Sequence, residues 1–302
     1  MKLNIWRFTD GKSGHDSQSN GLCIAIGELL PIKQFDLSTD SLTNCIKNLL
    51  FKEFPMGKNL PDPDIIIGAG HGTHLTMLAA KYIRKGKTII LMKPSLPFYL
   101  FDVCVIPKHD CPPKNKNIIE TTGALSSIKL NKNKTKKLGL ILIGGPSSHY
   151  QWDSKSIVKQ IDEITSTHTD INWTIADSPR TPKNLMPMIS TINKKNTSKL
   201  NFNNPPNKDI KKLIYAAEII WVSPDSMSMV FEALTSGASV GLLNIKGNKK
   251  SRIHKAVKHL ILNDHVTTFI SWEKRNKLKN NTMELNEARR CANILLNRGL
   301  LS

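Results

Sequence analysis

The sequence has few acidic residues, few cysteines and no long apolar run. Its 302 residues include 24 Asp or Glu against 43 Lys or Arg, a formal net charge of +19. The five cysteines form no Cys-x-x-Cys pair, which argues against a zinc site or a disulfide framework and suits a reducing compartment. No apolar run is long enough to cross a bilayer, and Met1 to Phe8 is too short for a signal peptide. We therefore expect a cytoplasmic protein that meets membranes only peripherally, on the inner face.

Aromatic residues are also scarce, at 6% of the chain. The basic surplus predicts an acidic partner, which could be nucleic acid, an anionic membrane or a phosphorylated substrate. Much of it lies in Lys- and Asn-rich stretches such as 131–137 and 276–281, which have few aromatic side chains. Stacking platforms and recognisable nucleic-acid-binding modules are missing, so we expect no specific nucleic-acid partner. A solvated basic face remains the simpler interpretation of these stretches.

A strand, a glycine-containing turn and a helix occur in that order at the start of each half of the chain. In the first half, Leu3 to Phe8 is the predicted strand, 9–15 the loop and Ser19 to Leu30 the helix. In the second half, Leu138 to Ile143 is followed by a Gly-Gly-Pro-Ser-Ser-His turn. Neither turn is a Walker loop or a complete dinucleotide fingerprint. The repetition nevertheless predicts α/β architecture with parallel sheets.

The stretch from 129 to 137 is rich in Lys and Asn and reads as a linker between the two halves. It predicts an N-terminal Rossmann-like domain over 1–130 and a C-terminal one over 138–285. An amphipathic pattern over 286–302 predicts a closing helix that packs across both domains. The polar, proline-containing stretch 193–208 is expected to lie on the surface.

The most informative stretch of the second half is 219–243, which predicts a β-α-β unit. A buried strand (219–222) leads through Ser223-Pro224-Asp225-Ser226 into a helix that ends before Gly237, and 239–243 forms the next strand. Backbone N–H groups in the first turn of a helix have no intrahelical partner, so this turn, with Ser226, Met227 and Ser228, is a natural phosphate site. Glu232 follows Ser228 by four residues and could accept hydrogen bonds from a ribose diol. An ordinary capped helix with a solvated Glu232 is the alternative.

The loop of the first half contains the candidate catalytic residue, His15. A histidine at the end of such a loop can act as a general base near neutral pH, although it could equally be a surface histidine that caps the helix. Asp10, Gly11, Lys12 and Gly14 complete this loop. His71 and His74 lie three residues apart in a second Gly/His turn, but nearby acidic or cysteine ligands are missing, which argues against a metal site. Arg180 could pair with a phosphate.

Five segments together resemble the mitochondrial-fission ELM family and its bacterial relatives, which are regarded as glycosyltransferases of GT-B architecture. The segments are Asp10-Gly11-Lys12-Ser13-Gly14-His15, Thr122-Gly123-Ala124-Leu125, the block from Ile143 to Asp153, Arg180-Thr181-Pro182, and Asp225 to Met229 with Glu232. The resemblance covers nearly the whole chain, and the Gly-Gly-Pro-Ser block is its most specific part. Pro179 and the Gly70-His71-Gly72 turn stand where the family usually carries basic residues.

The resemblance implies two Rossmann-like domains that face a cleft, with a nucleoside-diphosphate-sugar held mainly by the C-terminal one. It implies His15 near the acceptor, Glu232 on the donor ribose, and no bound metal or cofactor, because helix dipoles and basic side chains offset the diphosphate charge. Residues expected to bind the donor are Gly144, Gly145, Ser147, Ser148, Arg180, Ser226, Met227, Ser228 and Glu232. Asp10, Gly11, Lys12, Gly14 and His71 are expected on the acceptor side.

The predicted function is therefore transfer of a sugar from a nucleoside-diphosphate-sugar to a membrane-associated, cell-envelope acceptor, with an anionic membrane surface or a lipid-linked acceptor as partner. The alternative is a non-catalytic adaptor on a membrane surface, which is how plant members of the resembled family are understood to act in organelle division. Scaffolding alone would not require His15, Glu232 and both glycine turns. Their joint presence favours the enzyme.

Overall fold

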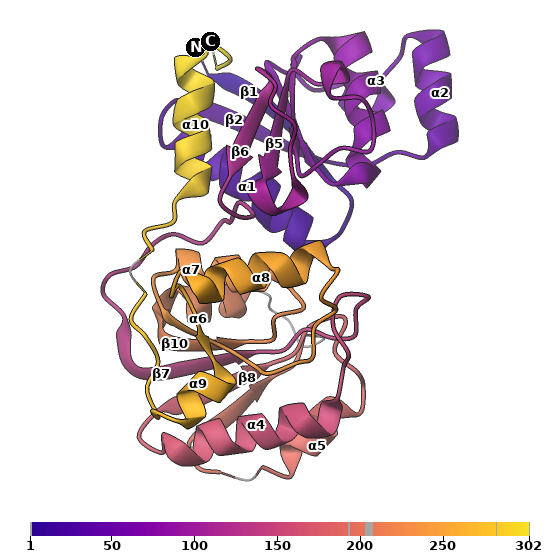
Figure 1. The fold of residues 1–302 in the computed structure, drawn as a ribbon. Coiled ribbons are helices and arrows are strands. Elements are labelled where there is room, and N and C mark those ends of the chain that lie inside the picture. Colours follow the sequence, from indigo (N-terminus) through magenta and orange to yellow (C-terminus); the bar gives the residue numbers. More distant parts are fainter. Residues whose placement is uncertain (1, 193, 203–207, 282, 302) are drawn as a thin grey trace. The chain divides into compact units, whose positions relative to one another are not determined.

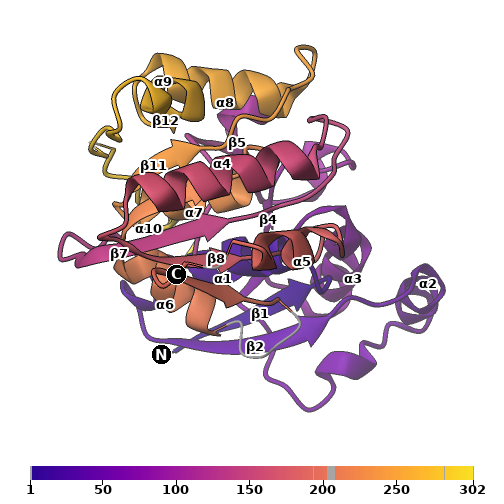
Figure 2. The ribbon, with the colours of Figure 1, turned by 90° about the horizontal axis from the view of Figure 1, so that it is seen from below.

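The chain folds into two compact units, each a Rossmann-like α/β domain (Figure 1). The computed structural model describes residues 2–192, 194–202, 208–281 and 283–301. Unit 1 comprises residues 1–127 and 286–302, and unit 2 comprises residues 128–285. In each unit, helices cover both faces of one six-stranded sheet whose paired strands all run parallel (Figures 1 and 2). The predicted α/β class with two Rossmann-like domains is confirmed.

Unit 1 has the strand order β2-β1-β3-β4-β5-β6. Its strands are β1 (Leu3–Thr9), β2 (Ile32–Ser38), β3 (Ile65–Ala69), β4 (Lys87–Leu91), β5 (Val103–Pro107) and β6 (Ile118–Thr121). Its α-helices are α1 (Ser13–Gly27), α2 (Leu42–Phe51), α3 (His74–Arg84) and α10 (Glu287–Asn297). Short 3-10 turns η1 (Pro55–Gly57), η2 (His71–Thr73), η3 (Phe98–Leu100) and η4 (Lys108–Asp110) connect them.

The sheet of unit 1 is buried on both faces, which explains the continuous apolar runs in its strands. Successive side chains of a strand point to opposite faces. Ile65 and Ile67 pack in one cluster with α1 and α10, whereas Ile66 and Trp6 pack in the other, with α3. The carboxyl ends of β1 and β3 therefore lie side by side, and the loops that follow them carry the candidate residues of this unit.

Unit 2 has the order β12-β11-β10-β7-β8-β9. Its strands are β7 (Thr135–Leu142), β8 (Asn172–Ala176), β9 (Thr197–Leu200), β10 (Ala217–Val222), β11 (Ser239–Leu242) and β12 (Thr267–Thr268). Its helices are α4 (Ser154–Thr167), α5 (Leu185–Ser190), α6 (Lys208–Ala216), α7 (Met227–Thr235), α8 (Arg252–Leu262) and α9 (Phe269–Glu273). Trp173, Trp221 and Trp272 fill one face of its core with α4 and α5. Since β7 pairs with both β8 and β10, the loops after these three strands meet at one edge.

Several predicted boundaries were wrong because tertiary packing overrides local pattern. The predicted linker already belongs to β7 from Thr135 onward, and the division between the units falls between Ser127 and Ile128. The polar stretch 193–208 contains β9, an edge strand that pairs with β8 and whose residues are all exposed or partly exposed, as the surface prediction requires. Its residues 193 and 203–207 lie outside the described part of the chain. The sequence analysis does not predict β2, β9, β12, α2, α5 and α9. Most of these are short, but α2 has a regular apolar spacing that could have been recognised.

The start of α1 is the boundary error that matters most for the site. The helix begins at Ser13, not Ser19, so Gly14 and His15 lie in its first turn and not in the preceding loop. The segment has poor helix formers, but Ser17, Gln18 and Ser19 are buried. Packing of that buried turn explains why the helix extends beyond what local propensity predicts.

The closing helix α10 belongs to unit 1. Its apolar stripe of Ala288, Cys291, Ala292 and Leu295 is buried in the same cluster as Leu22 of α1. We had expected this helix to pack across both domains; its stripe is instead covered by α1 and the unit 1 sheet. Within the described ranges, no helix has the length and apolar character needed to cross a membrane.

Candidate functional site

In unit 2, the turn after β7 is tied to the turn after β10. The backbone N–H of Gly144 donates to Ser223 Oγ at 2.7 Å, and that of Gly145 donates to Asp225 Oδ2 at 3.0 Å. Ser223 and Asp225 are both buried. Because adjacent parallel strands bring their carboxyl ends to one edge, a side chain from the second turn can hold the backbone of the first.

Glycine is required in this turn by close approach, not by unusual dihedral angles. A Cβ atom at Gly144 would lie 2.2 Å from Asp225 Oδ2, and one at Gly145 would lie 1.9 Å from the carbonyl oxygen of Arg180. The hydroxyl of Thr181 also donates to the carbonyl of Gly144, at 2.6 Å. The Gly-Gly pair is therefore packed between the Asp225 carboxylate and the loop after β8.

Asp225 is the central polar group of this edge, and the sequence interpretation gave it no separate role. Its side chain is fully buried, and Oδ2 accepts from Arg180 Nη2 at 2.8 Å as well as from Gly145. Its other oxygen, Oδ1, is buried with no hydrogen-bond partner in the described part of the chain, as is the hydroxyl of Tyr150. Burial, and then the Asp225 charge, raise the pKa of Tyr150. The sequence signal that could have indicated a role for Asp225 is its position as a charged residue between an apolar strand and an apolar helix.

The start of α7 lies directly after Asp225. Ser226 is the N-cap residue, but its side chain makes no capping hydrogen bond, and Met227 opens the helix. Ser228 and Glu232 are each partly exposed, while Met227, Val230, Phe231 and Leu234 are buried as predicted. The first backbone N–H groups of α7 therefore receive no capping bond from the Ser226 side chain, at a helix end that carries a partial positive charge.

Three further predicted donor residues surround the Gly-Gly turn. Arg180, expected to bind a phosphate directly, pairs with Asp225 in this structure, and 42% of its side chain stays exposed. Ser147 Oγ accepts from the N–H of His149 at 3.3 Å, and Ser148 is exposed. Arg180 is therefore held in place by a buried carboxylate while its guanidinium still reaches solvent.

In unit 1, His15 and Asp10 form a hydrogen-bonded pair. Nδ1 of His15 lies 2.9 Å from Asp10 Oδ2 and 3.1 Å from Oδ1, with side-chain exposures of 17% and 8%. Burial alone would raise the pKa of Asp10, but the hydrogen bond and charge of His15, together with Lys12, bring it below its ordinary value. A carboxylate on Nδ1 favours the tautomer with the proton there and leaves Nε2 as the basic nitrogen.

Gly70 packs against the ring of His15. It has φ of +77°, and a Cβ there would lie 2.3 Å from His15 Cε1. Gly11 has φ of +78° at the start of the loop. The Gly70 turn thus lies beside His15, as the pairing of β1 with β3 requires.

The two histidines after Gly70 differ in environment. His71 is exposed, whereas His74 is buried, with Nε2 unpartnered among the described residues. Burial, helped by the charge of His71, lowers the pKa of His74 to about 4. Over the described residues, no group of three or more His, Cys, Asp or Glu side chains is arranged to hold a metal ion.

Comparison with known families assigns the chain. Residues 13–299 match the family described as mitochondrial fission ELM1. The chain belongs to the mitochondrial fission ELM1 family. A relative from Rickettsia prowazekii (strain Madrid E), the uncharacterized protein RP120, is 25% identical to this ELM1-family protein over 78% of the chain and 81% of its own length.

Solved structures show the fold that this ELM1-family protein shares. A UDP-N-acetylglucosamine 2-epimerase superposes with a TM-score of 0.61 at 12% identity, covering 99% of this chain and 97% of that one. The UDP-GlcNAc 2-epimerase of Neisseria meningitidis, solved bound to UDP-GlcNAc, gives a TM-score of 0.55 at 13% identity and full coverage of both chains. At such low identity the likeness establishes the two-domain GT-B fold alone.

The structure sorts the predicted residues of this ELM1-family protein into two groups. Gly144, Gly145 and Arg180 lie around Asp225 at one edge of the unit 2 sheet, and Ser226 to Ser228 follow directly in the chain. Asp10, His15 and the Gly70–Gly72 turn meet at one edge of the unit 1 sheet. Each group lies at carboxyl ends of parallel strands, where open α/β sheets bind ligands.

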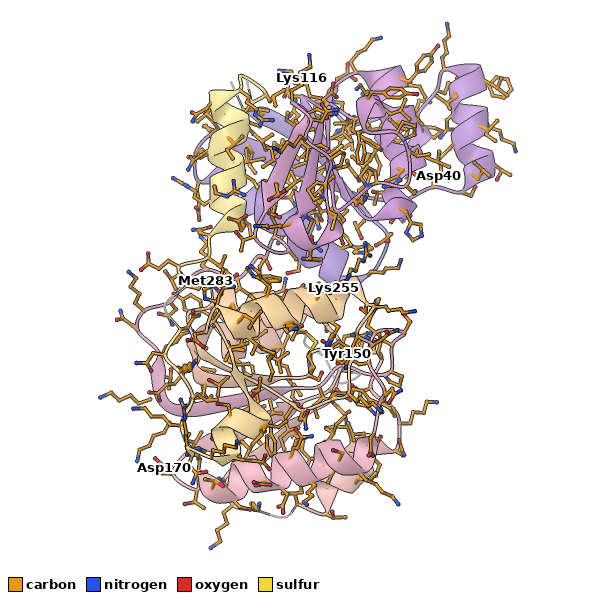
Figure 3. The ribbon with its side chains drawn as sticks, viewed as in Figure 1. Asp40, Lys116, Tyr150, Asp170, Lys255 and Met283 are labelled. Atoms are coloured by element: carbon orange, nitrogen blue, oxygen red, sulfur yellow. The ribbon has the colours of Figure 1, made fainter. Side chains whose placement is uncertain are left out.

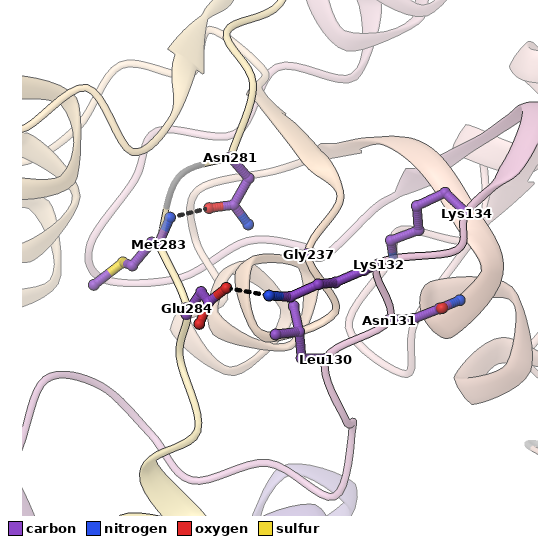
Figure 4. A pocket seen from close by; sticks show the side chains of 8 residues that line it. All are labelled: Leu130, Asn131, Lys132, Lys134, Gly237, Asn281, Met283 and Glu284. Atoms are coloured by element: carbon purple, nitrogen blue, oxygen red, sulfur yellow. Dashed lines mark hydrogen bonds and ion pairs between the residues drawn. The ribbon is translucent and has the colours of Figure 1, made fainter.

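A separate pocket of about 340 Å³ lies at the far end of α7 (Figure 4). Its lining residues are Leu130, Asn131, Lys132, Lys134, Gly237, Asn281, Met283 and Glu284. Burial lowers the pKa of Lys134 to about 8. Its ammonium group donates to the carbonyl of Tyr215 at 2.9 Å and to Ser236 Oγ at 3.2 Å, near the ends of α6 and α7. These bonds give Lys134 a structural role, and none of the predicted site residues lines the pocket.

Proposed function

We propose that this ELM1-family protein is a GT-B glycosyltransferase that moves a sugar from a nucleoside-diphosphate-sugar to a membrane-associated acceptor. The observation that carries the proposal is in unit 2. There, buried Asp225 holds both the Gly144–Gly145 turn and the Arg180 guanidinium, directly before the start of α7.

The chemistry of the donor fits this arrangement. A diphosphate leaving group needs N–H donors and positive charge, which the first turn of α7 and the exposed part of Arg180 supply. Glu232, on α7, would accept hydrogen bonds from the ribose hydroxyls. The solved Neisseria epimerase of this fold binds a nucleotide-sugar, UDP-GlcNAc, which supports the substrate class. Because helix and arginine offset the charge, the proposed mechanism uses no metal and no further cofactor.

The chemistry of the acceptor fits the pair in unit 1. Transfer requires removal of a proton from the acceptor hydroxyl as the new glycosidic bond forms. His15, oriented through Nδ1 by Asp10 at 2.9 Å, can take that proton at Nε2. The Asp10 carboxylate then stabilises the imidazolium that results. We propose a cytoplasmic location with peripheral attachment to the inner face of the membrane, where a lipid-linked acceptor is available.

A thermal-shift and calorimetry screen with UDP, ADP, GDP and their sugar conjugates tests the proposal. One of these ligands should raise the melting temperature, since a ligand at 100 times its Kd stabilises by about 2.7 kcal/mol. Glu232→Ala should weaken that ligand by roughly 1–3 kcal/mol, because ribose hydroxyls would lose their acceptor. Glu273→Ala, which alters an exposed carboxylate in the same unit, should bind normally.

The competing function is the non-catalytic membrane adaptor. If the protein is an adaptor, no nucleoside diphosphate should raise its melting temperature, and Glu232→Ala should behave like the original chain with every ligand. That pair of results would reject the transferase.

A further inference from the structure

Helix α2 of unit 1 exposes most of its apolar side chains. It spans Leu42–Phe51, packs against α3, and buries only Cys45 and Asn48. Its large apolar residues have exposures of 59% for Leu42, 48% for Ile46, 39% for Leu49, 74% for Leu50 and 74% for Phe51. Single exposed apolar residues are common, but five on one ten-residue helix form a patch, and patches mark interaction sites.

Four of the five exposed apolar residues form one stripe, and Phe51 lies off it on another side of the helix. Leu42, Ile46, Leu49 and Leu50 follow the i, i+4, i+7, i+8 spacing of a single helix face. Such a stripe normally packs into the core of its own domain. Here the buried face of α2 is instead the narrow one that contains Cys45 and Asn48, so the wide apolar stripe lacks an intramolecular partner among the described residues.

Neighbouring elements extend the apolar character of this region. Leu75 and Tyr82, one face of α3, are 44% and 58% exposed, and Tyr99 of η3 is 81% exposed. Lys81 of α3 donates to the carbonyl of Leu100, at 3.4 Å, so η3 lies against α3. Tyrosine is suited to a boundary between water and an apolar phase, because its ring is apolar and its hydroxyl polar.

Positive charge accompanies the patch. Lys47, Lys52 and Lys58 are exposed on or just after α2, against one exposed acid, Glu53. Unit 1 as a whole holds 18 Lys or Arg and 12 Asp or Glu, a net charge of +6. An apolar stripe with lysines at its margin is the composition of a helix that lies in the plane of an anionic membrane surface.

The shape of the region distinguishes a membrane from a protein groove. α2 lies at the outer edge of unit 1, with α3 beside it, and begins after Asp40 (Figures 1, 2 and 3). The patch is carried by a protruding helix (Figures 1 and 2) and offers no groove of its own into which a partner's helix or strand would fit. A convex apolar surface can enter the boundary between lipid headgroups and acyl chains, which deforms to accept it.

We propose that α2 docks unit 1 on an anionic lipid bilayer, with its apolar stripe in the interfacial region and its lysines on lipid phosphates. The inference extends the proposed function only by naming the surface at which a membrane-associated acceptor would be met. Vesicle binding requires neither donor nor turnover, so a failed docking test and a failed transferase test are distinguishable.

Cosedimentation of the full chain with vesicles of phosphatidylglycerol and phosphatidylcholine tests the proposal. The double variant Ile46→Ser, Leu50→Ser should weaken binding roughly tenfold or more, because two large apolar side chains of the stripe no longer enter the bilayer. The matched control is Leu262→Ser on α8, whose residue is 71% exposed in unit 2; it should bind within about twofold of the original chain. Undiminished binding of the double variant would overturn the proposal.

A second measurement locates the helix directly. Quenching of tryptophan fluorescence by brominated lipids should be strong for Leu50→Trp, whereas for Leu262→Trp it should not exceed the background of the native tryptophans. The two variants add a tryptophan at equally exposed positions, so their difference isolates α2. Equal quenching of both variants would overturn the proposal. So would sedimentation velocity that shows a dimer lost only in the Ile46→Ser, Leu50→Ser double variant, because a second copy would then be the occupant.

Discussion

Two aspartates with different partners organise the two candidate groups. The side chain of Asp225 is fully buried, and its Oδ2 accepts from a backbone N–H and from an arginine, which keeps the Gly144–Gly145 turn and the Arg180 guanidinium in place. Asp10 is mostly buried and faces a histidine. Buried carboxylates are costly unless hydrogen-bonded, and the bonds that Asp225 Oδ2 accepts from Gly145 and Arg180 offset part of that cost.

At His15, the expected effect of substitution separates a base from a structural residue. His15→Asn should lower turnover by roughly 10²–10⁴, the range for losing a general base, with donor affinity unchanged. Asp10→Asn should also lower turnover, because the amide no longer selects the Nδ1–H tautomer. Lys114→Met is the control, since Lys114 is an exposed lysine of the same unit and belongs to neither candidate group. Near-normal turnover of His15→Asn, measured with the sugar transfer assay, would make His15 a structural residue of the first turn of α1.

The lowered pKa of buried His74 predicts that the folded protein loses stability as the pH falls. Its pKa in the folded protein is about 4, against 6.5 ordinarily. Above pH 6.5 it is neutral in both states and contributes no pH dependence. As pH falls from 6.5 to 4, the unfolded chain takes up a proton that the folded chain does not, so stability falls by up to about 3 kcal/mol. Denaturant titrations of His74→Gln across this range should show a smaller decline; an identical decline would contradict the assignment.

At the scale of elements, the turn between β7 and α4 is set by its contacts with the loops after β8 and β10. Gly145→Ala would place a Cβ 1.9 Å from the backbone oxygen of Arg180. The turn and the Arg180 backbone must then move apart, which disturbs the hydrogen bond from Gly145 to Asp225. We expect a loss of about 2–4 kcal/mol in unfolding free energy together with loss of nucleotide binding.

Gly11→Ala is the matched control for Gly145→Ala. Gly11 has φ of +78°, but no atom lies within 4 Å of an added Cβ. The Gly11→Ala substitution should therefore lower the unfolding free energy by only about 1–2 kcal/mol, through backbone strain. Urea denaturation of both variants measures the difference. If Gly145→Ala cost no more than Gly11→Ala, the close packing of the turn would not be important.

At the scale of the molecule, the basic surplus is shared unequally. Unit 2 holds 25 Lys or Arg and 12 Asp or Glu, a net charge of +13, against +6 for unit 1. We expect binding to anionic vesicles to weaken as salt is raised from 50 to 300 mM, since each basic residue near such a surface contributes about 1 kcal/mol and salt screens it. Cosedimentation with neutral vesicles is the control. Equal binding to neutral and anionic vesicles at low salt would contradict the expectation.

The sequence by itself determined the class of fold and the position of both glycine turns. Buried parallel strands need continuous apolar runs, and turns with close backbone contacts need glycine. The local sequence is therefore enough to predict the strand at Ile65 to Ala69 and the turn at Gly144-Gly145. The β-α-β unit around α7 was predicted for the same reason, because its core face repeats every three to four residues and Gly237 follows its end.

Tertiary structure alone decided the contacts between distant residues. Arg180 and Asp225 are 45 positions apart, and nothing in their local patterns indicates an ion pair. The early start of α1 depends on burial of Ser17 to Ser19, and β9 is a strand because β8 offers it hydrogen bonds. The outward stripe of α2 could not be predicted either, because periodicity shows that a helix has an apolar face but not whether another element covers it.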